Sequence, residues 1–298
     1  MKIISVQFDY PGSSRYDKLS RVLEYSIKKN CPGAEFNLIR IDAPSSWRTK
    51  KCFASNTVKL QRWVDEMEKT NEDIIFLDCD MIVLRDLHDA FKMDFDIALT
   101  VNGTGSIPYN GGAVFCRNTS AARDFIRLWN KCNHELYNDT KKHLKWRMKY
   151  AGMNQAALGY MLETNAVRVT DITSEHKQIK AFESLVNIKR LPCSIWNVCK
   201  NDWRNMNDKM YILHVKSALR TAVLDPRANA IYYRMFSAAI KAWRRMAFEA
   251  GVIKSAEGAE LYEVPPYIAS LKMLRNSNRY RNKLAARAHR RRWHTRII

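Results

Sequence analysis

Two carboxylates follow directly on an apolar stretch in Asp73–Asp86, which reads DIIFLDCDMIVLRD. Asp78 and Asp80 lie two positions apart, so at the end of an extended strand both side chains point to the same side. Two like charges at the rim of a core repel each other and lose hydration. A divalent cation bound between them removes that penalty by supplying the opposite charge. The pair therefore predicts a metal site, and a metal site in this position indicates an enzyme.

The residues before this pair have the pattern of a buried strand. Ile74–Leu77 is an apolar run typical of a strand that is covered on both faces in a parallel sheet. Strand patterns at 3–8 and 36–41 alternate with helix patterns over 16–29 and from 55 or 56 to 67. This alternation predicts an α/β fold with βαβ units and a mainly parallel central sheet. Ligands of such sheets bind beyond the carboxyl ends of the strands, where Asp78 and Asp80 fall.

The same three-residue pattern occurs again at Asp94 and Asp96. This second pair has no apolar run before it and opens the strand pattern at 97–101. We interpret it as a loop or strand-start pair. Asp-x-Asp alone is therefore weak support for a metal site. The prediction depends on the position of Asp78 and Asp80 directly after an apolar strand pattern.

The rest of the chain continues the mixed pattern. Strands are expected at 112–116 and 210–214, and helices from 119 or 120 to 136, over 153–163 and over 227–250. Residues 141–150, KKHLKWRMKY, look like a basic loop. Val264-Pro265-Pro266 marks the best boundary. We expect one catalytic domain over residues 1–263 and a basic helical extension over residues 264–298.

Composition limits the class of protein. With 298 residues, 46% of them hydrophobic, the chain can build one sizeable core. It contains no apolar run of about eighteen residues, so no transmembrane helix is expected. Asp9 interrupts the first apolar stretch too early for a signal peptide. Seven cysteines without a Cys-x-x-Cys pair predict free thiols in a reducing cytosol.

Positive charge is the other compositional feature. The net charge is +20, and the residues after Glu263 contain ten Lys or Arg and no Asp or Glu. Half of the excess charge therefore lies in this last segment. Such a charge predicts a polyanionic partner, which could be nucleic acid, an anionic membrane or a phosphorylated substrate.

Six segments, in order, resemble GT-A fold glycosyltransferases, above all family 8, the glycogenin and lipopolysaccharide galactosyltransferase group. They are IISVQFDY with the helix after it, DIIFLDCDMIVLRDL, YNGGAVFCR, GMNQAALGYML, LPCSIWN and YILHVKSALR, and they span roughly residues 1–220. Asn154 stands where the family usually has Asp, and Ser217 replaces a Gly. The resemblance implies a single GT-A domain, a hexosyl- or pentosyltransferase that uses a nucleotide-diphosphate sugar, UDP-sugar by default, and retains the anomeric configuration.

The resemblance also implies roles for individual residues. His214 would be the third metal ligand beside Asp78 and Asp80, and a mixed oxygen and nitrogen set suits Mn²⁺ somewhat better than Mg²⁺. Lys216 and Arg220 would hold the departing phosphates. Contacts to the nucleoside, the diphosphate or the sugar are expected from Asp9, Tyr10, Tyr16, Lys59, Gly111 and Gly112. The catalytic and sugar-binding positions are expected at Asn110, Asn154 and Gln155.

The acceptor is open at this stage. The arginine-rich end and the basic segment at 141–150, with Trp146 and Tyr150 between the charges, favour a hydroxylated base in phage-type DNA. The alternative is an envelope glycan reached from an anionic membrane surface, with residues 267–274 as a shallow anchor. A third possibility is a basic nucleic-acid-binding protein without enzymatic activity. A cytoplasmic location, peripheral to a membrane in the second case, is expected, and the oligomeric state is open.

Overall fold

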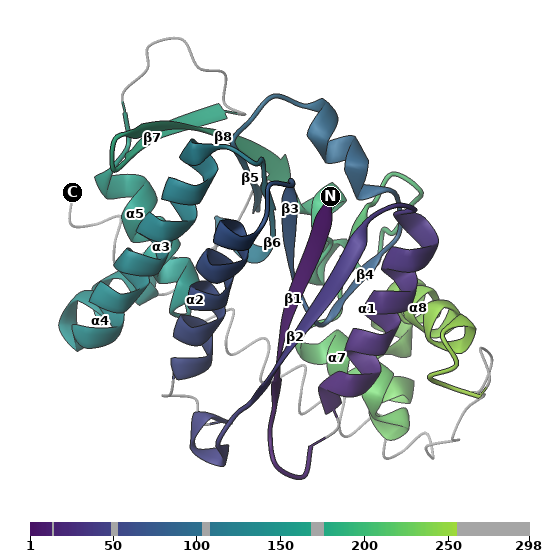
Figure 1. Cartoon of the computed structure of the whole chain (residues 1–298). Helices are drawn as coiled ribbons and strands as arrows, with labels where there is room; N and C mark the ends of the chain where they lie inside the picture. The colour runs from purple at the N-terminus through teal and green to yellow at the C-terminus, as the bar shows by residue number, and fades with distance from the viewer. Residues whose placement is uncertain (14, 49–52, 103–107, 168–175, 255–298) are drawn as a thin grey trace, which may run out of the picture.

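The computed structural model describes residues 1–13, 15–48, 53–102, 108–167 and 176–254. The expected boundary at 263/264 and the basic extension over 264–298 lie outside these residues. Within them, the chain forms a mixed α/β fold in which helices cover both faces of a central sheet (Figure 1).

The central sheet has seven strands in the order β2-β1-β3-β6-β5-β8-β7. They are β1 Lys2–Asp9, β2 Glu35–Asp42, β3 Ile74–Asp78, β5 Ile97–Val101, β6 Tyr109–Cys116, β7 His176–Ala181 and β8 Ser184–Pro192. β1, β2, β3, β5 and β8 run in one direction, while β6 and β7 run against their neighbours. The predicted mainly parallel sheet is therefore confirmed.

β3 shows why the apolar run before Asp78 is a strand. Ile74 and Phe76 face one core, and Ile75 and Leu77 face the other, because successive side chains of a strand point to opposite faces. All four are at most 1% exposed. The sheet is thus covered on both faces at this strand, as the sequence predicts.

Two groups of helices form the outer layers (Figure 1). α2 Ala54–Lys69, α3 Ser120–Asn138, α4 Thr140–Tyr150 and α5 Asn154–Thr164 lie on one side of the sheet. α1 Arg15–Asn30, α7 Ser217–Leu224 and α8 Pro226–Glu249 lie on the other. The short elements between them are η1 Ser45–Arg48, η2 Leu87–Lys92, α6 Cys193–Trp196 and η3 Lys200–Asp202.

A second, two-stranded sheet joins distant parts of the chain. β4 Met81–Val83 pairs antiparallel with β9 Ile212–His214, and Met81 lies opposite His214. The expectation that Asp78 and Asp80 share one extended strand is wrong. The chain turns at Cys79 and Asp80, immediately after β3, and enters the other sheet. This turn rather than strand alternation brings both carboxylates to the same side.

Two further expectations meet different outcomes. Residues 141–150 were expected as a loop, but they belong to α4, whose first turn is capped when Asp139 accepts a hydrogen bond from the Lys142 N–H (2.9 Å). The six cysteines that the structure describes are free and buried, as predicted, and Cys52 lies outside the described residues.

Candidate active site

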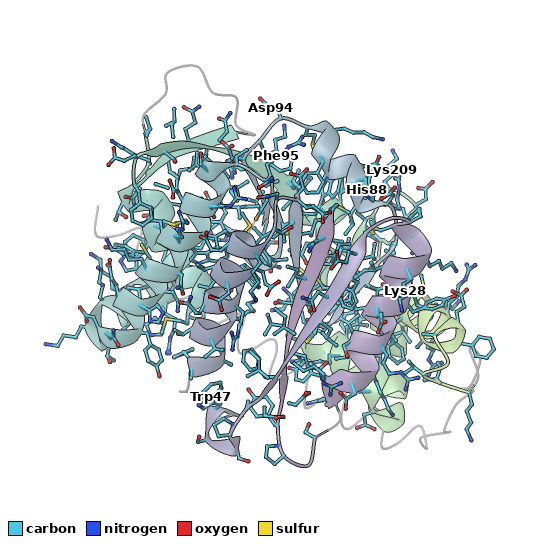
Figure 2. All side chains as sticks on the ribbon, in the orientation of Figure 1. Lys28, Trp47, His88, Asp94, Phe95 and Lys209 are labelled. Atoms are coloured by element: carbon cyan, nitrogen blue, oxygen red, sulfur yellow. The ribbon has the colours of Figure 1, made fainter. Side chains whose placement is uncertain are left out.

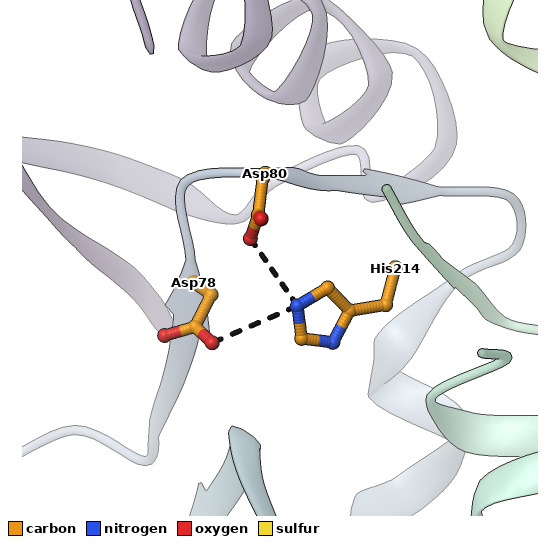
Figure 3. Close-up of side chains that lie close together, drawn as sticks. All are labelled: Asp78, Asp80 and His214. Carbon is orange, nitrogen blue, oxygen red and sulfur yellow. Dashed lines mark ion pairs between the residues drawn. The ribbon is translucent and has the colours of Figure 1, made fainter. Parts of the chain in front are cut away.

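Asp78, Asp80 and His214 converge at the carboxyl end of β3 (Figure 3). His214 Nε2 lies 3.2 Å from Asp80 Oδ1 and 3.7 Å from Asp78 Oδ2. Asp80 and His214 are buried, at 6% and 4% exposure, whereas Asp78 is only partly covered. Among the described residues this is the one group of three acidic, His or Cys side chains whose ligand atoms gather within 4.8 Å.

Backbone hydrogen bonds fix how these residues meet. His214 ends β9, and the Val215 N–H donates to the carbonyl oxygen of Asp80 at 2.7 Å. The pairing of β4 with β9 therefore places the imidazole next to Asp80, although 134 positions separate the two residues in the chain. Long-range pairing, rather than local sequence, completes the cluster.

β6 closes the site from the other side with a glycine. A Cβ atom at Gly112 would lie 2.7 Å from His214 Cε1 and 2.9 Å from Asp78 Oδ2. Real Cβ atoms do not approach other atoms so closely, so Gly112 makes room for the side chains of His214 and Asp78. The neighbouring Gly111 faces Trp129 instead.

Basic side chains neutralise the two carboxylates. Lys59 Nζ donates to Asp78 Oδ1 at 2.8 Å, and Arg220 Nη1 donates to Asp80 Oδ2 at 3.1 Å. Burial raises the pKa of Asp80, but His214, Arg220 and Lys216 outweigh it, so this pKa lies below its usual value. Asp80 is therefore held as an anion.

Tyr16 supports the arginine. Arg220 Nη1 also donates to the hydroxyl oxygen of Tyr16 at 2.7 Å. Burial, only partly offset by Arg220, raises the pKa of Tyr16 to about 12, so the tyrosine stays neutral. The guanidinium is thus fixed between a phenol and a carboxylate.

A pocket of about 250 Å³ opens beside the cluster. Six of the predicted site residues line it, namely Tyr10, Tyr16, Lys59, Asp78, Asp80 and Arg220. The other lining residues are Val6, Phe8, Ser55, Asn56 and Cys79, and the sequence patterns gave no reason to assign them to the site. Its wall combines apolar and aromatic groups with two carboxylates and two cations, as expected of a pocket for a charged aromatic ligand.

The donor set fits a divalent metal ion. With metal–ligand distances of about 2.1 Å, neighbouring ligand atoms of an octahedron lie about 3 Å apart. The separations of 3.2 and 3.7 Å from His214 Nε2 to the carboxylate oxygens are close to this value. Hard oxygens with one imidazole nitrogen suit Mn²⁺ or Mg²⁺.

Four other predicted residues do not line the pocket. Asp9 accepts a hydrogen bond from Arg40 Nε at 2.7 Å, and Lys216 precedes α7 as its N-cap residue. Asn110 is buried, and its Oδ1 accepts from the Gly112 N–H at 3.1 Å. Asn110 therefore shapes the backbone of β6, and Gly111 packs on Trp129.

The start of α5 holds the last two predicted residues. Trp129 Nε1 donates to the carbonyl oxygen of Asn154 at 2.9 Å, and Gln155 Nε2 donates to the Tyr109 carbonyl at 3.1 Å. The Asn154 side chain is 7% exposed, and neither its Nδ2 nor its Oδ1 has a hydrogen-bond partner within the described residues. Buried amides are normally paired, so the unpaired Asn154 side chain is an exception among the described residues.

Sequence reasoning missed the residues behind His214. Asn197 and Thr100 are both 0% exposed, and Asn197 Oδ1 lies 3.0 Å from His214 Nδ1. Asn197 was visible only as the last letter of the LPCSIWN segment, and Thr100 carries no sequence signal beyond its strand.

Comparison with known families gives the identity of this arrangement. The model of the nucleotide-diphospho-sugar transferase family matches residues 30–221, which is more than half of the chain. The chain belongs to this family. The match covers α2, β3, β6, the start of α5 and His214. The transferase is a GT-A glycosyltransferase that resembles family 8, so the expectation from the ordered segments is confirmed.

Solved structures of other glycosyltransferases are similar to this transferase. One is involved in glycosylation of the major capsid of PBCV-1 (14% identity, 72% of this chain and 93% of that chain, TM-score 0.47). GlyE of Streptococcus pneumoniae TIGR4 shares 14% identity over 86% of this chain and 64% of its own, with a TM-score of 0.45. The galactosyltransferase LgtC shares 11% identity over 86% of this chain and 97% of its own (TM-score 0.47). No curated protein sequence matches the chain.

Membrane spanning has no support in the helices that the structure describes. None of them combines the length and the apolar character needed to cross a bilayer.

Proposed function

We propose that the transferase moves a sugar from a nucleotide-diphosphate sugar, UDP-sugar by default, to a hydroxyl acceptor, with Mn²⁺ preferred over Mg²⁺ as its metal. The observation that carries the proposal is the convergence of Asp78, Asp80 and His214 with Lys59 and Arg220 in one pocket. The two carboxylates match the positive charge of a metal ion, and the two cationic side chains match the negative charge of a diphosphate.

The protein side chains would divide the donor between them. Asp78, Asp80 and His214 would hold a divalent metal, which would supply positive charge to the diphosphate leaving group. Arg220 and Lys216, at the start of α7, would hold the phosphate oxygens, and Lys59 would contact the diphosphate or the sugar from α2. Tyr10 and Tyr16 would contact the nucleoside, and Asp9 would lie at its edge.

The sugar would lie toward β6 and α5. Asn154 has two buried polar atoms without partners among the described residues, which supports hydrogen bonds to sugar hydroxyls. Gln155 is held by the Tyr109 carbonyl, next to Asn110. We propose that Asn110, Asn154 and Gln155 surround the anomeric carbon and that transfer retains its configuration, as the family 8 resemblance implies.

For the acceptor we propose DNA that carries hydroxylated bases. Support comes from the net charge of +20 and from α4, where Lys141 and Lys145 are exposed and pair with no acidic side chain of the described structure. The aromatic side chains of α4 already pack within the protein and would not stack on bases. Trp146 already stacks on Tyr150, at 6.1 Å between ring centroids, and packs against Tyr160 at 5.3 Å.

One observation supports a second acceptor class. Leu144 and Met148 are 52% and 79% exposed on α4, and they share a face with Lys141 and Lys145 at helical spacing. Apolar and basic side chains on one face are typical of helices that lie on an anionic membrane. An envelope glycan is therefore the alternative acceptor.

A thermal shift experiment tests the enzymatic proposal. UDP with Mn²⁺ should raise the Tm of the full chain, and Asp80→Ala should abolish the shift. A donor-hydrolysis screen over nucleotide-sugars with Mn²⁺ should then identify the donor. If neither nucleotide nor metal changes the Tm, a basic nucleic-acid-binding protein becomes the better explanation.

The two acceptor classes separate in binding experiments. Salt-sensitive binding to DNA that is lost when residues 264–298 are removed supports the DNA proposal. Binding to vesicles that contain anionic lipid, without binding to DNA, supports the membrane alternative.

A further inference from the structure

A line of buried hydrogen bonds runs from β6 to the imidazole of His214. Thr100 Oγ1 lies 2.8 Å from the carbonyl oxygen of Asn110, and Asn197 Nδ2 lies 2.9 Å from Thr100 Oγ1. Asn197 Oδ1 then lies 3.0 Å from His214 Nδ1. Thr100, Asn197 and His214 are at most 4% exposed, so water does not compete for these bonds.

The direction of each bond follows from its first member. A carbonyl oxygen can only accept, so the Thr100 hydroxyl donates its single hydrogen to the carbonyl oxygen of Asn110. The Cys193 thiol is also close to Thr100, but sulfur is the weaker acceptor. The Thr100 oxygen can therefore only accept from Asn197, which fixes the amide with Nδ2 toward Thr100 and Oδ1 toward His214.

This amide orientation determines which imidazole nitrogen can bind a metal. Because an amide oxygen accepts and never donates, His214 must carry a proton on Nδ1. In the neutral ring the lone pair is then on Nε2, the atom that faces Asp80 at 3.2 Å and Asp78 at 3.7 Å. A lone pair opposite two carboxylates needs a cation between them.

We propose that Asn197 and Thr100 are positioning residues that fix His214 as an Nε2 metal ligand in the Nδ1–H tautomer. Partners of this kind orient metal-binding histidines, and losing them typically lowers metal affinity about 10- to 100-fold. Asn197 acts directly on the ring, and Thr100 acts through Asn197. The inference rests on the proposed metal site, because it explains how the orientation and tautomer of His214 in that site are fixed.

Matched variants test the role of Thr100 without emptying the core. Thr100→Val keeps the shape but removes the hydroxyl that orients the amide, whereas Thr100→Ser keeps the hydroxyl. Titration of the full-length protein with Mn²⁺, with free Mn²⁺ followed by electron paramagnetic resonance, should show about a tenfold loss of affinity for Thr100→Val and little loss for Thr100→Ser.

The same comparison applies at Asn197. Asn197→Leu removes the acceptor for the His214 N–H and should weaken Mn²⁺ binding further than Thr100→Val. Asn197→Asp keeps an acceptor oxygen for the His214 N–H but loses the donor to Thr100, so it should retain clearly more affinity than Asn197→Leu. A merely structural role would lower Tm and Mn²⁺ affinity in parallel, without this rescue by the acidic variant.

Nitrogen NMR of the unmodified chain gives the decisive measurement, even if a variant fails to fold. With diamagnetic Mg²⁺ and UDP bound, the His214 ring should show a protonated Nδ1 and an unprotonated Nε2, with the signals assigned by their loss in His214→Asn. A proton on Nε2, or equal Mn²⁺ affinity of Thr100→Val and Thr100→Ser, overturns the inference. If the unmodified chain binds neither Mn²⁺ nor Mg²⁺, the proposed function itself is wrong.

Discussion

Two Asp-x-Asp pairs in one chain have opposite surroundings. Asp78 and Asp80 follow the carboxyl end of β3, whereas Asp96 immediately precedes β5. β3 and β5 run in the same direction, and Cys116 of β6 pairs with the first residue of each. The two pairs therefore lie at opposite ends of the sheet. Asp94 is exposed at the edge of the molecule, next to the buried Phe95 (Figure 2).

The partners of the carboxylates differ just as much. Asp96 accepts hydrogen bonds from Thr119 Oγ1 (2.8 Å) and from the Asn187 N–H (2.9 Å), both neutral groups that its carboxylate ties together. Asp78 and Asp80 face a lysine, an arginine and an imidazole. Neutral partners leave Asp96 in a structural contact between two strands and a helix, whereas carboxylates with cationic partners can also attract a metal ion. The charge of the partners, rather than the motif, separates the functional pair from the structural one.

The largest effect should come from removing one ligand of the first pair. Asp80→Ala takes away a proposed metal ligand and the partner of Arg220, so cleavage of the donor should slow at least about a hundredfold. Donor hydrolysis with Mn²⁺ measures it. The matched change in the second pair, Asp96→Ala, should leave this activity unchanged. Equal losses in both variants would remove the distinction between the pairs.

Substitution of Gly112, which lies against Asp78 of the first pair, should give the next largest effect. In Gly112→Ala, the new methyl group would meet His214 Cε1 at 2.7 Å and Asp78 Oδ2 at 2.9 Å. Displacing a reacting group by about 1 Å can reduce a rate about a hundredfold, and here we expect a loss of about tenfold or more in Mn²⁺ affinity and in rate.

Gly111→Ala is the control for this change. Its methyl group would meet only Trp129, at 3.2 Å, so Mn²⁺ affinity should change little. Titration of both variants with Mn²⁺ compares them. Normal Mn²⁺ binding by Gly112→Ala would show that the close approach in β6 is not needed by the metal ligands.

Exchange of cations at Asp80 predicts two effects of opposite sign. Arg220→Met removes a positive charge that lies 3.1 Å from Asp80 Oδ2 and would repel a metal ion, so Mn²⁺ alone should bind about fivefold more tightly. The same variant lacks a charged donor for the diphosphate, so UDP should bind about tenfold more weakly in the presence of Mn²⁺. Calorimetric titrations measure both affinities.

Arg62 supplies the matched control for Arg220. It pairs with Asp65 on the exposed surface of α2, away from the pocket lining, so Arg62→Met should change neither affinity. Weaker Mn²⁺ binding in Arg220→Met would contradict the exchange of one cation for another at Asp80.

The position of the first pair at the end of a buried strand could be predicted from the sequence, because the pattern that indicates it is local. The apolar run of β3 ends at Asp78, and the edge at which a parallel strand ends binds ligands. The alternation of strands and helices likewise predicted the core of the fold. His214 was expected only from resemblance to a family, since no local pattern links it to Asp80.

The parts that were missed depend on contacts between distant segments. The turn at Cys79 and the pairing of β4 with β9 decide where Asp80 and His214 meet. Asn197 matters because its amide faces His214, and nothing in its own neighbours in sequence reveals that. The basic segment at 141–150 was wrongly expected as a loop, because its helix depends on the Asp139 cap and on aromatic packing against α5. Most of the features that could not be predicted from the sequence are therefore contacts between polar residues that lie far apart in the chain.

The smallest expected effect is on stability, and it concerns the second pair, Asp94 and Asp96. Asp96→Ala removes two hydrogen bonds to a charged acceptor, which lowers the free energy of unfolding by about 2 kcal/mol and the Tm by about 5 °C. Asp94→Ala changes an exposed residue and should stay within about 0.5 kcal/mol of the unmodified chain. Urea unfolding of both variants, with donor hydrolysis measured on the folded protein, tests this. Loss of hydrolysis in a folded Asp96→Ala variant would mean that the second pair, at the far end of the sheet, also serves the reaction.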